Sequence, residues 1–318
     1  MKFSRQTTLR SQATVFGVGV HSGSPVTLTL GPAPVDAGFI FVRTDLEGRG
    51  EIQASADSVT STEFATVLGD CEGPLVATTE HLLAALRGMG VDNATIEIDG
   101  PEVPIMDGSA AAFVTAIDQA GIVTQPAPRR FIQVLKPVRV VMGDSFGELR
   151  PYAAGFRAEV EIDFANQLIG RQTYTLDLSP EGFRREVSRA RTFGFMTDVA
   201  RLWSKGFSLG ASFENAVVFD DTRLLNPEGL RYSDECARHK VLDAVGDLAL
   251  AGLPMLGAYR SFRGGHKLNH AVLTALIADR SAWRVVEGEA ARRSRTPAEV
   301  GAGMVGGMIA PAYGPDVS

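Results

Sequence analysis

Two parts of the chain carry the same order of predicted elements, and this repeat constrains the fold more than any other feature. Residues 79–87 favour a helix, with Thr78 or Thr79 as its cap, and about 234–251 favour a longer one that stops at Gly252. EHLLAA at 80–85 aligns with RHKVLD at 238–243, and a glycine, a strand and a second helix follow each. The match indicates an internal duplication. A pseudo-twofold axis would make His81 and His239 face one another between two domains.

Short alternating runs predict strands in both halves, and we expect those of the first half to be antiparallel. The second helix of the first half is expected from Asp107–Ser109 to Ala120, ending at Gly121. The expected strands are Val26–Leu30, Phe39–Arg43, Thr95–Asp99, Val134–Val141, Gly147–Tyr152, Arg157–Phe164 and Thr173–Leu178, and the further helices are Pro180–Ala190 and about Lys267–Ala278.

Two prolines and no apolar periodicity mark TQPAPRR at 124–130 as the best linker candidate. We therefore expect an N-terminal domain at 1–124, a linker at 125–130 and a C-terminal domain at 131–285. The remainder, 286–318, is rich in alanine and glycine and is expected to be a mobile tail.

Composition excludes several classes of protein. Hydrophobic residues make up 45% of the 318 residues and charged residues 21%, which is ordinary for a globular protein with a sizeable core. The net charge of −6 argues against a general nucleic-acid binder. The N-terminus lacks a signal-peptide core, and we find no membrane-spanning run, so we expect a cytoplasmic protein. Cys71 and Cys236 are too few for a disulfide framework or a thiolate metal site.

Five histidines supply the candidate chemistry. His239 and Asp243 are spaced i, i+4, so both side chains project from one helix face and can chelate one metal ion. His81 is the natural third ligand, which leaves the open fourth position of a catalytic zinc site. Glu80 could take a proton from the attacking water. The alternatives are a surface His–Asp pair and a first-turn glutamate that is favoured by the helix dipole. The protease motif HExxH is absent.

Two other segments are candidates on weaker grounds. His266 follows two glycines at the start of a helix, where it could line a cleft or simply cap the helix. The segment GVGVHSG at 17–23 could cradle a phosphate, although it fits neither the P-loop nor the GxGxxG pattern.

Five motifs together resemble one family. They are TEHL at 79–82, PIMDGSA at 104–110, ARTFGFM at 190–196, RHKVLDAVGDL at 238–248 and GHKLN at 265–269. The chain is similar, from about residue 3 to about residue 285, to the UDP-3-O-acyl-N-acetylglucosamine deacetylases, zinc enzymes of lipid A synthesis in Gram-negative bacteria.

The resemblance implies an α+β fold of two similar βααβ-type domains, each a mainly antiparallel sheet on a helix pair, with the helix layers facing each other. It implies zinc (Zn²⁺) held by His81, His239 and Asp243. Glu80 would be the general base, and the oxyanion would be held with help from the hydroxyl of Thr192. The second catalytic group would be a cationic His266, oriented by Asp247. Either His266 or Glu80 could protonate the leaving amine.

The resemblance also implies the substrate, UDP-3-O-(3-hydroxyacyl)-N-acetylglucosamine, and its products, acetate and the free-amine UDP-sugar. The expected substrate contacts are Lys240, Arg150, Phe193, Met196, Val199 and Ser212, with arginine at 150 where some relatives are expected to have lysine. The insert at 194–219 would line an acyl passage, although its apolar residues could equally be ordinary core. We expect a monomer. The alternatives are a zinc amidase for another substrate class and an inactive zinc-stabilised binding protein.

Overall fold

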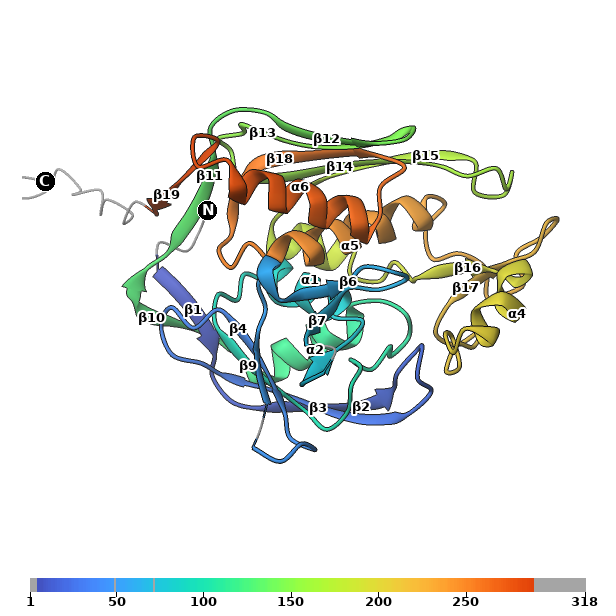
Figure 1. Ribbon diagram of the computed structural model, residues 1–318, viewed down its shortest axis with the longest axis horizontal. Helices are drawn as coiled ribbons and strands as arrows, with labels where there is room; N and C mark the ends of the chain where they lie inside the picture. The colour runs from blue at the N-terminus through green and yellow to red at the C-terminus, as the bar shows by residue number, and fades with distance from the viewer. Residues whose placement is uncertain (1–4, 49, 71, 289–318) are drawn as a thin grey trace, which may run out of the picture.

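Two β-sheets enclose two layers of helices in the computed structural model, which describes residues 5–48, 50–70 and 72–288 (Figure 1). One sheet belongs to the N-terminal half and the other to the C-terminal half, and the helices of both halves meet between them. The predicted α+β class and the facing helix layers are confirmed.

The N-terminal sheet has the strand order β2-β3-β9-β4-β5. Its strands are β2 (Ala13–Val18), β3 (Pro25–Pro32), β4 (Phe39–Arg43), β5 (Gly50–Gln53) and β9 (Ala94–Ile98). Alternation places Leu28 and Leu30 in the core and the intervening threonine outward. The expectation of a purely antiparallel sheet was wrong, because β4 runs parallel to β9. The chain from β4 to β9 passes through the buried helix α1 before it returns to the sheet. The alternation of residues within a strand gives no information about the direction in which the strand runs.

The C-terminal sheet has the order β12-β13-β18-β11-β19, and β14 adds β15 beside β18. Its strands are β11 (Arg130–Val134), β12 (Val138–Met142), β13 (Ser145–Arg150), β14 (Phe156–Asp163), β15 (Arg171–Asp177), β18 (Met255–Phe262) and β19 (Trp283–Glu287). In β14 every second residue from Phe156 is buried, which is the pattern of a strand with one face on the core.

Six helices occupy the described chain, and two of them form the contact between the halves. The helices are α1 (Glu80–Gly88), α2 (Ala111–Ala120), α3 (Pro180–Glu186), α4 (Met196–Ser204), α5 (Glu235–Ala249) and α6 (His266–Ala278). All nine residues of α1 are buried, including its polar ones, because α1 packs directly against α5. None of the helices in the described residues is long and apolar enough to cross a membrane.

The segment expected to be a linker is instead extended chain in two strands. Strand β10 (Ile122–Pro128) pairs with β1 (Arg5–Leu9), and β11 follows at once. Its prolines are tolerated because β10 pairs on one side only. The partner strand lies more than a hundred residues away in sequence, so local pattern could not reveal the pairing.

Two further boundaries differ from the expectation. The single strand expected at 134–141 is two strands, β11 and β12, because Lys136 and Pro137 interrupt it. The expected end of the second domain at 285 falls inside β19, which pairs with β11 along its whole length. Most of the expected tail, 289–318, and Cys71 lie outside the described residues, whereas Cys236 is a buried free thiol.

Smaller elements flank the helix layers. A three-stranded sheet contains β6 (Val59–Ser61), β7 (Val67–Gly69) and β8 (Leu75–Val76), preceded by the short 3-10 helix η1 (Ala56–Ser58). The insert expected at 194–219 contains α4, and strands β16 (Phe193–Phe195) and β17 (Val217–Phe219) pair in parallel at its base. It projects from one end of the molecule (Figure 1).

Candidate metal centre and acid–base site

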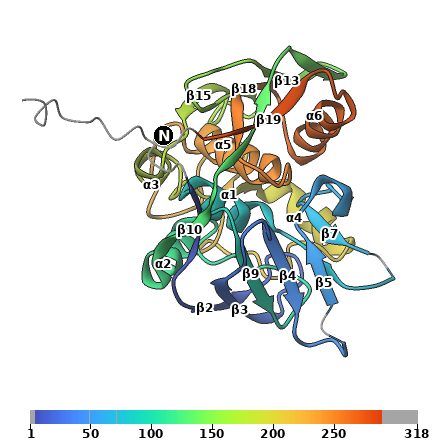
Figure 2. The ribbon, with the colours of Figure 1, turned by 90° about the vertical axis from the view of Figure 1, so that its left-hand side faces the viewer.

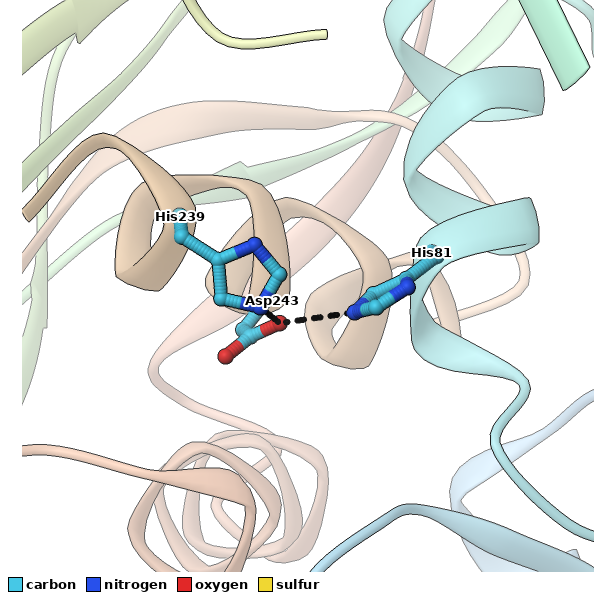
Figure 3. Close-up of side chains that lie close together, drawn as sticks. All are labelled: His81, His239 and Asp243. Atoms are coloured by element: carbon cyan, nitrogen blue, oxygen red, sulfur yellow. Dashed lines mark ion pairs between the residues drawn. The ribbon is translucent and has the colours of Figure 1, made fainter. Parts of the chain in front are cut away.

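Helices α1 and α5 bring the three predicted ligands together at the contact between the halves (Figure 3). Oδ1 of Asp243 lies 3.3 Å from Nε2 of His239 and 3.6 Å from Nε2 of His81. The two imidazole rings are nearly perpendicular, with centroids 4.9 Å apart. One ligand atom of each side chain therefore faces a common point.

The donor set suits a divalent metal ion. All three side chains are buried, and Oδ1 of Asp243 has no hydrogen-bond partner within the described chain. A buried carboxylate oxygen without a partner is costly unless a cation compensates it. Two imidazole nitrogens and one carboxylate oxygen form a ligand combination that zinc accepts at catalytic sites, with one coordination position left open.

Neighbouring groups fix the protonation of these ligands. Burial lowers the pKa of His239 to about 3, so its ring is neutral, and Nδ1 donates a hydrogen bond of 3.0 Å to the carbonyl of Ala190. This bond leaves the lone pair on Nε2, toward the centre. Burial opposes ionisation of Asp243, but the charge of Lys240 and hydrogen bonding hold its pKa well below the usual value. Nζ of Lys240 donates to Oδ2 at 2.7 Å, which leaves Oδ1 free.

A buried ion pair holds the loop that orients His239. Oε1 of Glu235 accepts hydrogen bonds from both the backbone N–H and the Nε of Arg191, at 3.0 and 2.9 Å. Both side chains are almost fully buried. Because Arg191 directly follows Ala190, this pair fixes the carbonyl that receives the His239 ring.

Glu80 and His266 lie beside the ligand cluster. Oε1 of Glu80 is 3.8 Å from Nε2 of His266, and its Oε2 accepts the backbone N–H of Thr66 at 3.0 Å. Burial raises the pKa of Glu80, although the charge of His266 opposes this rise. Burial also disfavours the cation of His266, but Asp247 and Glu80 outweigh it and raise the pKa to about 10. The two groups form an acid–base pair of opposite charge.

Asp247 receives hydrogen bonds from several directions and orients His266. Oδ2 accepts Nδ1 of His266 at 2.9 Å and Nδ2 of Asn269 at 2.8 Å, while Oδ1 accepts the hydroxyl of Thr66 at 2.6 Å. The hydroxyl of Tyr259 donates to Oδ1 of Asn269 at 2.5 Å. Sequence reasoning missed Thr66, Asn269 and Tyr259, because their roles depend on contacts between distant segments.

Thr192 and Phe193 follow the loop that orients His239, and β16 begins at Phe193. The carbonyl of Thr192 accepts the backbone N–H of Val217 at 2.8 Å, and the backbone N–H of Thr192 donates to the carbonyl of Gly108 at 2.7 Å. The ring of Phe193 lies edge-on to His239 at 6.3 Å, and Nζ of Lys240 lies 5.6 Å from the centre of the same ring. The structure thus brings Phe193 and Lys240 to the border of the metal centre, and Thr192 directly precedes Phe193 in the chain.

The three insert residues lie farther out. Met196 begins α4 and is 42% exposed, and Val199 is half-buried on the same helix. Ser212 is exposed, and its hydroxyl accepts the backbone N–H of Glu214 at 3.2 Å. The tip of the insert reaches the N-terminal half, where Leu209 and Gly210 donate to the carbonyls of His21 and Val20.

Arg150, expected as a substrate contact, is not brought to this site. In β13 the neighbouring Leu149 is buried and Gly147 packs against α6, so alternation turns Arg150 to the opposite face of the sheet. There its Nη2 binds both carboxylate oxygens of Glu159, at 2.7 and 2.8 Å. One-residue alternation decides which face a strand side chain occupies, and it directs Arg150 away from the ligand cluster.

The glycine-rich segment at 17–23 encloses a carboxylate. The backbone N–H groups of His21 and Ser22 donate to the two oxygens of Glu102 at 2.9 and 2.8 Å. Glu102 also accepts the hydroxyl of Thr78, and a Cβ at Gly19 would lie 2.1 Å from its Oε2. The expected anion cradle is therefore filled by the protein's own glutamate.

A cavity of about 340 Å³ opens beside His266. Arg263 and Lys267, two cations that the sequence analysis did not single out, line it together with Ser145 and Thr62. The acid–base pair consequently adjoins a cavity lined by two cationic side chains, of which Arg263 is paired with Asp163 at 3.2 Å.

The comparisons with known proteins agree with this geometry. The family model described as UDP-3-O-acyl N-acetylglycosamine deacetylase matches residues 6–278. The chain belongs to this family. Proteins named UDP-3-O-acyl-N-acetylglucosamine deacetylase from Brucella ovis and Brucella canis are each 50% identical to it over 283 residues, which cover 89% of this chain and 98% of the relative. A protein of that name from Brucella abortus matches to the same extent.

Proposed function

We propose that this protein is a zinc-dependent amide hydrolase that removes the N-acetyl group of UDP-3-O-(3-hydroxyacyl)-N-acetylglucosamine. The products are acetate and the free-amine UDP-sugar. The observation that carries the proposal is the convergence of three buried ligands with a carboxylate and a cationic imidazole in direct reach of one another. The printed names of the 50% identical relatives point to the substrate.

His81, His239 and Asp243 hold the metal in this proposal, and Lys240 keeps the carboxylate of Asp243 in place through its other oxygen. Bound zinc supplies Lewis acidity, which polarises an amide carbonyl and lowers the pKa of water. The ligand cluster is compatible with binding of a zinc ion, because each of the three residues offers one ligand atom to the same point.

Glu80 acts as the general base. Its carboxylate takes a proton from the water whose oxygen attacks the acetamide carbon. Oε2 is held by the N–H of Thr66, so Oε1 is the atom that faces the reaction. The neighbouring charge of His266 favours the ionised form that a base requires.

His266 acts as a cation throughout the attack. Its pKa of about 10 keeps the ring protonated at neutral pH, so it stabilises the oxyanion together with the hydroxyl of Thr192. When the C–N bond breaks, the amine takes a proton from His266 or from Glu80. Asp247 holds the ring in one orientation for both tasks.

The remaining substrate contacts are assigned separately to the diphosphate end and the acyl end of the substrate. A diphosphate needs cations, and Arg263 and Lys267 line the cavity beside His266. An acyl chain needs an apolar surface, and we assign it to the insert with Met196 and Val199, next to Phe193. Ser212 sets the free width of that passage in this proposal.

Acetate release from the acylated UDP-sugar, with and without a zinc chelator, tests the proposal. We expect turnover that stops on chelation and returns with zinc. A substrate without the acyl chain distinguishes this activity from that of a zinc amidase of another class. Glu80→Gln should keep its zinc and lose roughly 10²-fold in rate or more, on the scale of a general base. Glu97→Gln, on β9, is the matched control and should retain activity. Full activity of Glu80→Gln would refute the assigned base.

A further inference from the structure

A second, larger cavity of about 600 Å³ lies between the two halves, away from the acid–base site. It is lined by the C-terminal ends of α1 and α5, the start of α3, and parts of β10, β11 and β14. Figure 2 shows these helices and β10 on one side of the molecule. The volume falls in the range of small-molecule binding sites.

Apolar side chains form most of the wall. They include Ile122, Phe131, Phe156, Val245, Leu248 and Leu253. Such a surface favours the hydrocarbon part of a ligand, because each buried methylene group adds to the free energy of binding.

Two buried arginines interrupt this apolar wall. Arg87 and Arg129 both line the cavity and are each 7% exposed. They share one carboxylate: Oδ1 of Asp92 is 2.9 Å from Nε of Arg129 and 3.6 Å from Nη1 of Arg87. Oδ2 of Asp92 is occupied by Thr7. One positive charge is therefore in excess at this point of the wall.

Arg87 carries that excess. Its Nε and Nη1 are buried and have no hydrogen-bond partner in the described part of the chain, and only Nη2 donates, to the carbonyl of Gly252 at 3.3 Å. The ring of Phe39 covers the guanidinium. Burial and the neighbouring charge of Arg129 lower the pKa of Arg87 to about 10, although Asp92 opposes this shift. A buried charge of this kind is stabilised by an anion.

The other acidic groups around the cavity do not supply this anion. Asp177 is engaged by Arg157, whose Nε and Nη2 donate to its two oxygens at 2.8 and 2.7 Å. Glu181 is exposed at the start of α3.

We propose that this cavity binds an amphipathic anion, a small molecule with one carboxylate or phosphate head and an apolar body. The head group lies at Arg87 and Arg129, and the body lies along the apolar wall. Arg87 is six residues after the ligand His81 on α1, about 9 Å along the helix axis, so the site is distinct from the metal centre. The proposal does not depend on the proposed deacetylase activity.

Calorimetric titration of the zinc-loaded full chain with decanoate tests this site. Decyl phosphate and neutral decanol are the other two probes. We expect decanoate or decyl phosphate to bind at least tenfold more tightly than decanol, and the tighter of the two identifies the head group. Arg87→Gln should weaken binding of the anions about tenfold and leave that of decanol unchanged.

A cavity-filling variant gives an independent test if Arg87→Gln folds poorly. Ala154 and the neighbouring Ala153 are both exposed, but only Ala154 lines the cavity. Ala154→Trp should abolish binding, and Ala153→Trp should bind as the native chain does. Unchanged binding in both Arg87→Gln and Ala154→Trp, loss of binding when zinc is removed, or no binding at millimolar decanoate would each overturn the proposal.

Discussion

Gly246 touches Glu80 so closely that a Cβ atom at position 246 would lie 2.0 Å from the carbonyl oxygen of Glu80. Only glycine permits this approach of α5 to α1. The contact lies beside the site itself, since Glu80 and His81 are on one helix and Asp243 and Asp247 are on the other. The spacing of the metal ligands and the packing of the two halves are therefore set at the same point.

Substitution of Gly246 by alanine should damage stability and metal binding together. The added methyl group forces the helices apart, and overpacking of this kind costs about 1–3 kcal/mol of unfolding free energy. Denaturant unfolding and zinc content measure the two effects. Gly31→Ala is the control, because its Cβ would lie 3.5 Å from the nearest atom, at ordinary contact distance. A Gly246→Ala protein with native stability and zinc content would contradict this account.

Loss of a metal ligand should reduce both zinc content and stability. We expect His239→Ala to lose its zinc, because only two of the three ligands, His81 and Asp243, remain. Zinc bound to the native chain should add about 2.7 kcal/mol to the unfolding free energy when free zinc is ~100 times its Kd. Metal analysis and thermal unfolding with and without chelator measure both quantities. His270→Ala, on α6 outside the cluster, should keep its zinc. Full zinc occupancy in His239→Ala would refute the assignment.

The sequence was sufficient to predict the parts of the site that lie on helices. The i, i+4 spacing of His239 and Asp243 fixes their common face, and the repeat pairs them with His81. The position of Arg150, which binds Glu159 and not the ligand cluster, could not be predicted, because a strand residue changes face with each step. The role of Thr66 could not be predicted from the sequence, because its carboxylate partners Glu80 and Asp247 are 14 and 181 residues away. Contacts of this kind depend on how the halves dock, which no local pattern describes.

The same reason explains why the strands in the expected linker could not be predicted. Prolines and missing periodicity are typical of irregular chain, and both are present at 124–130. The segment forms β10 because β1, at the other end of the N-terminal half, supplies a partner. A strand that pairs on one side only tolerates proline, and a partly buried strand needs no alternating pattern of apolar residues.

The alkaline limb of the pH profile should report His266. The proposed mechanism requires its protonated form, so kcat/KM should fall as pH rises through about 10. Asp247→Asn removes a charge that raises this pKa, and we expect the limb to move to lower pH. Titration of the His266 ring by NMR measures the same shift without activity. Asp57→Asn is the control, because Asp57 acts on His270 and is not among the causes of the His266 shift. An unchanged His266 titration in Asp247→Asn would contradict this assignment.

Substitution of Ser212 by leucine should change which acyl chains the enzyme accepts. In the proposed passage the small serine leaves room for hydrocarbon, so leucine should block long chains by steric overlap. Each methylene group that no longer enters costs about 0.8 kcal/mol of binding. Zinc content and turnover of short chains should stay near native, because His81, His239 and Asp243 lie on α1 and α5 and not on the insert.

Turnover of substrates with short and long acyl chains, compared between the native and Ser212→Leu proteins, measures this selectivity. Ser204→Leu is a suitable control, since Ser204 is exposed at the end of α4 in the same insert and its hydroxyl donates only to the nearby carbonyl of Arg201. An equal loss on both chain lengths would mean that the insert near Ser212 is simply structural. No loss on either would place the passage elsewhere, because a bulky side chain cannot stand in an acyl channel without excluding part of the chain.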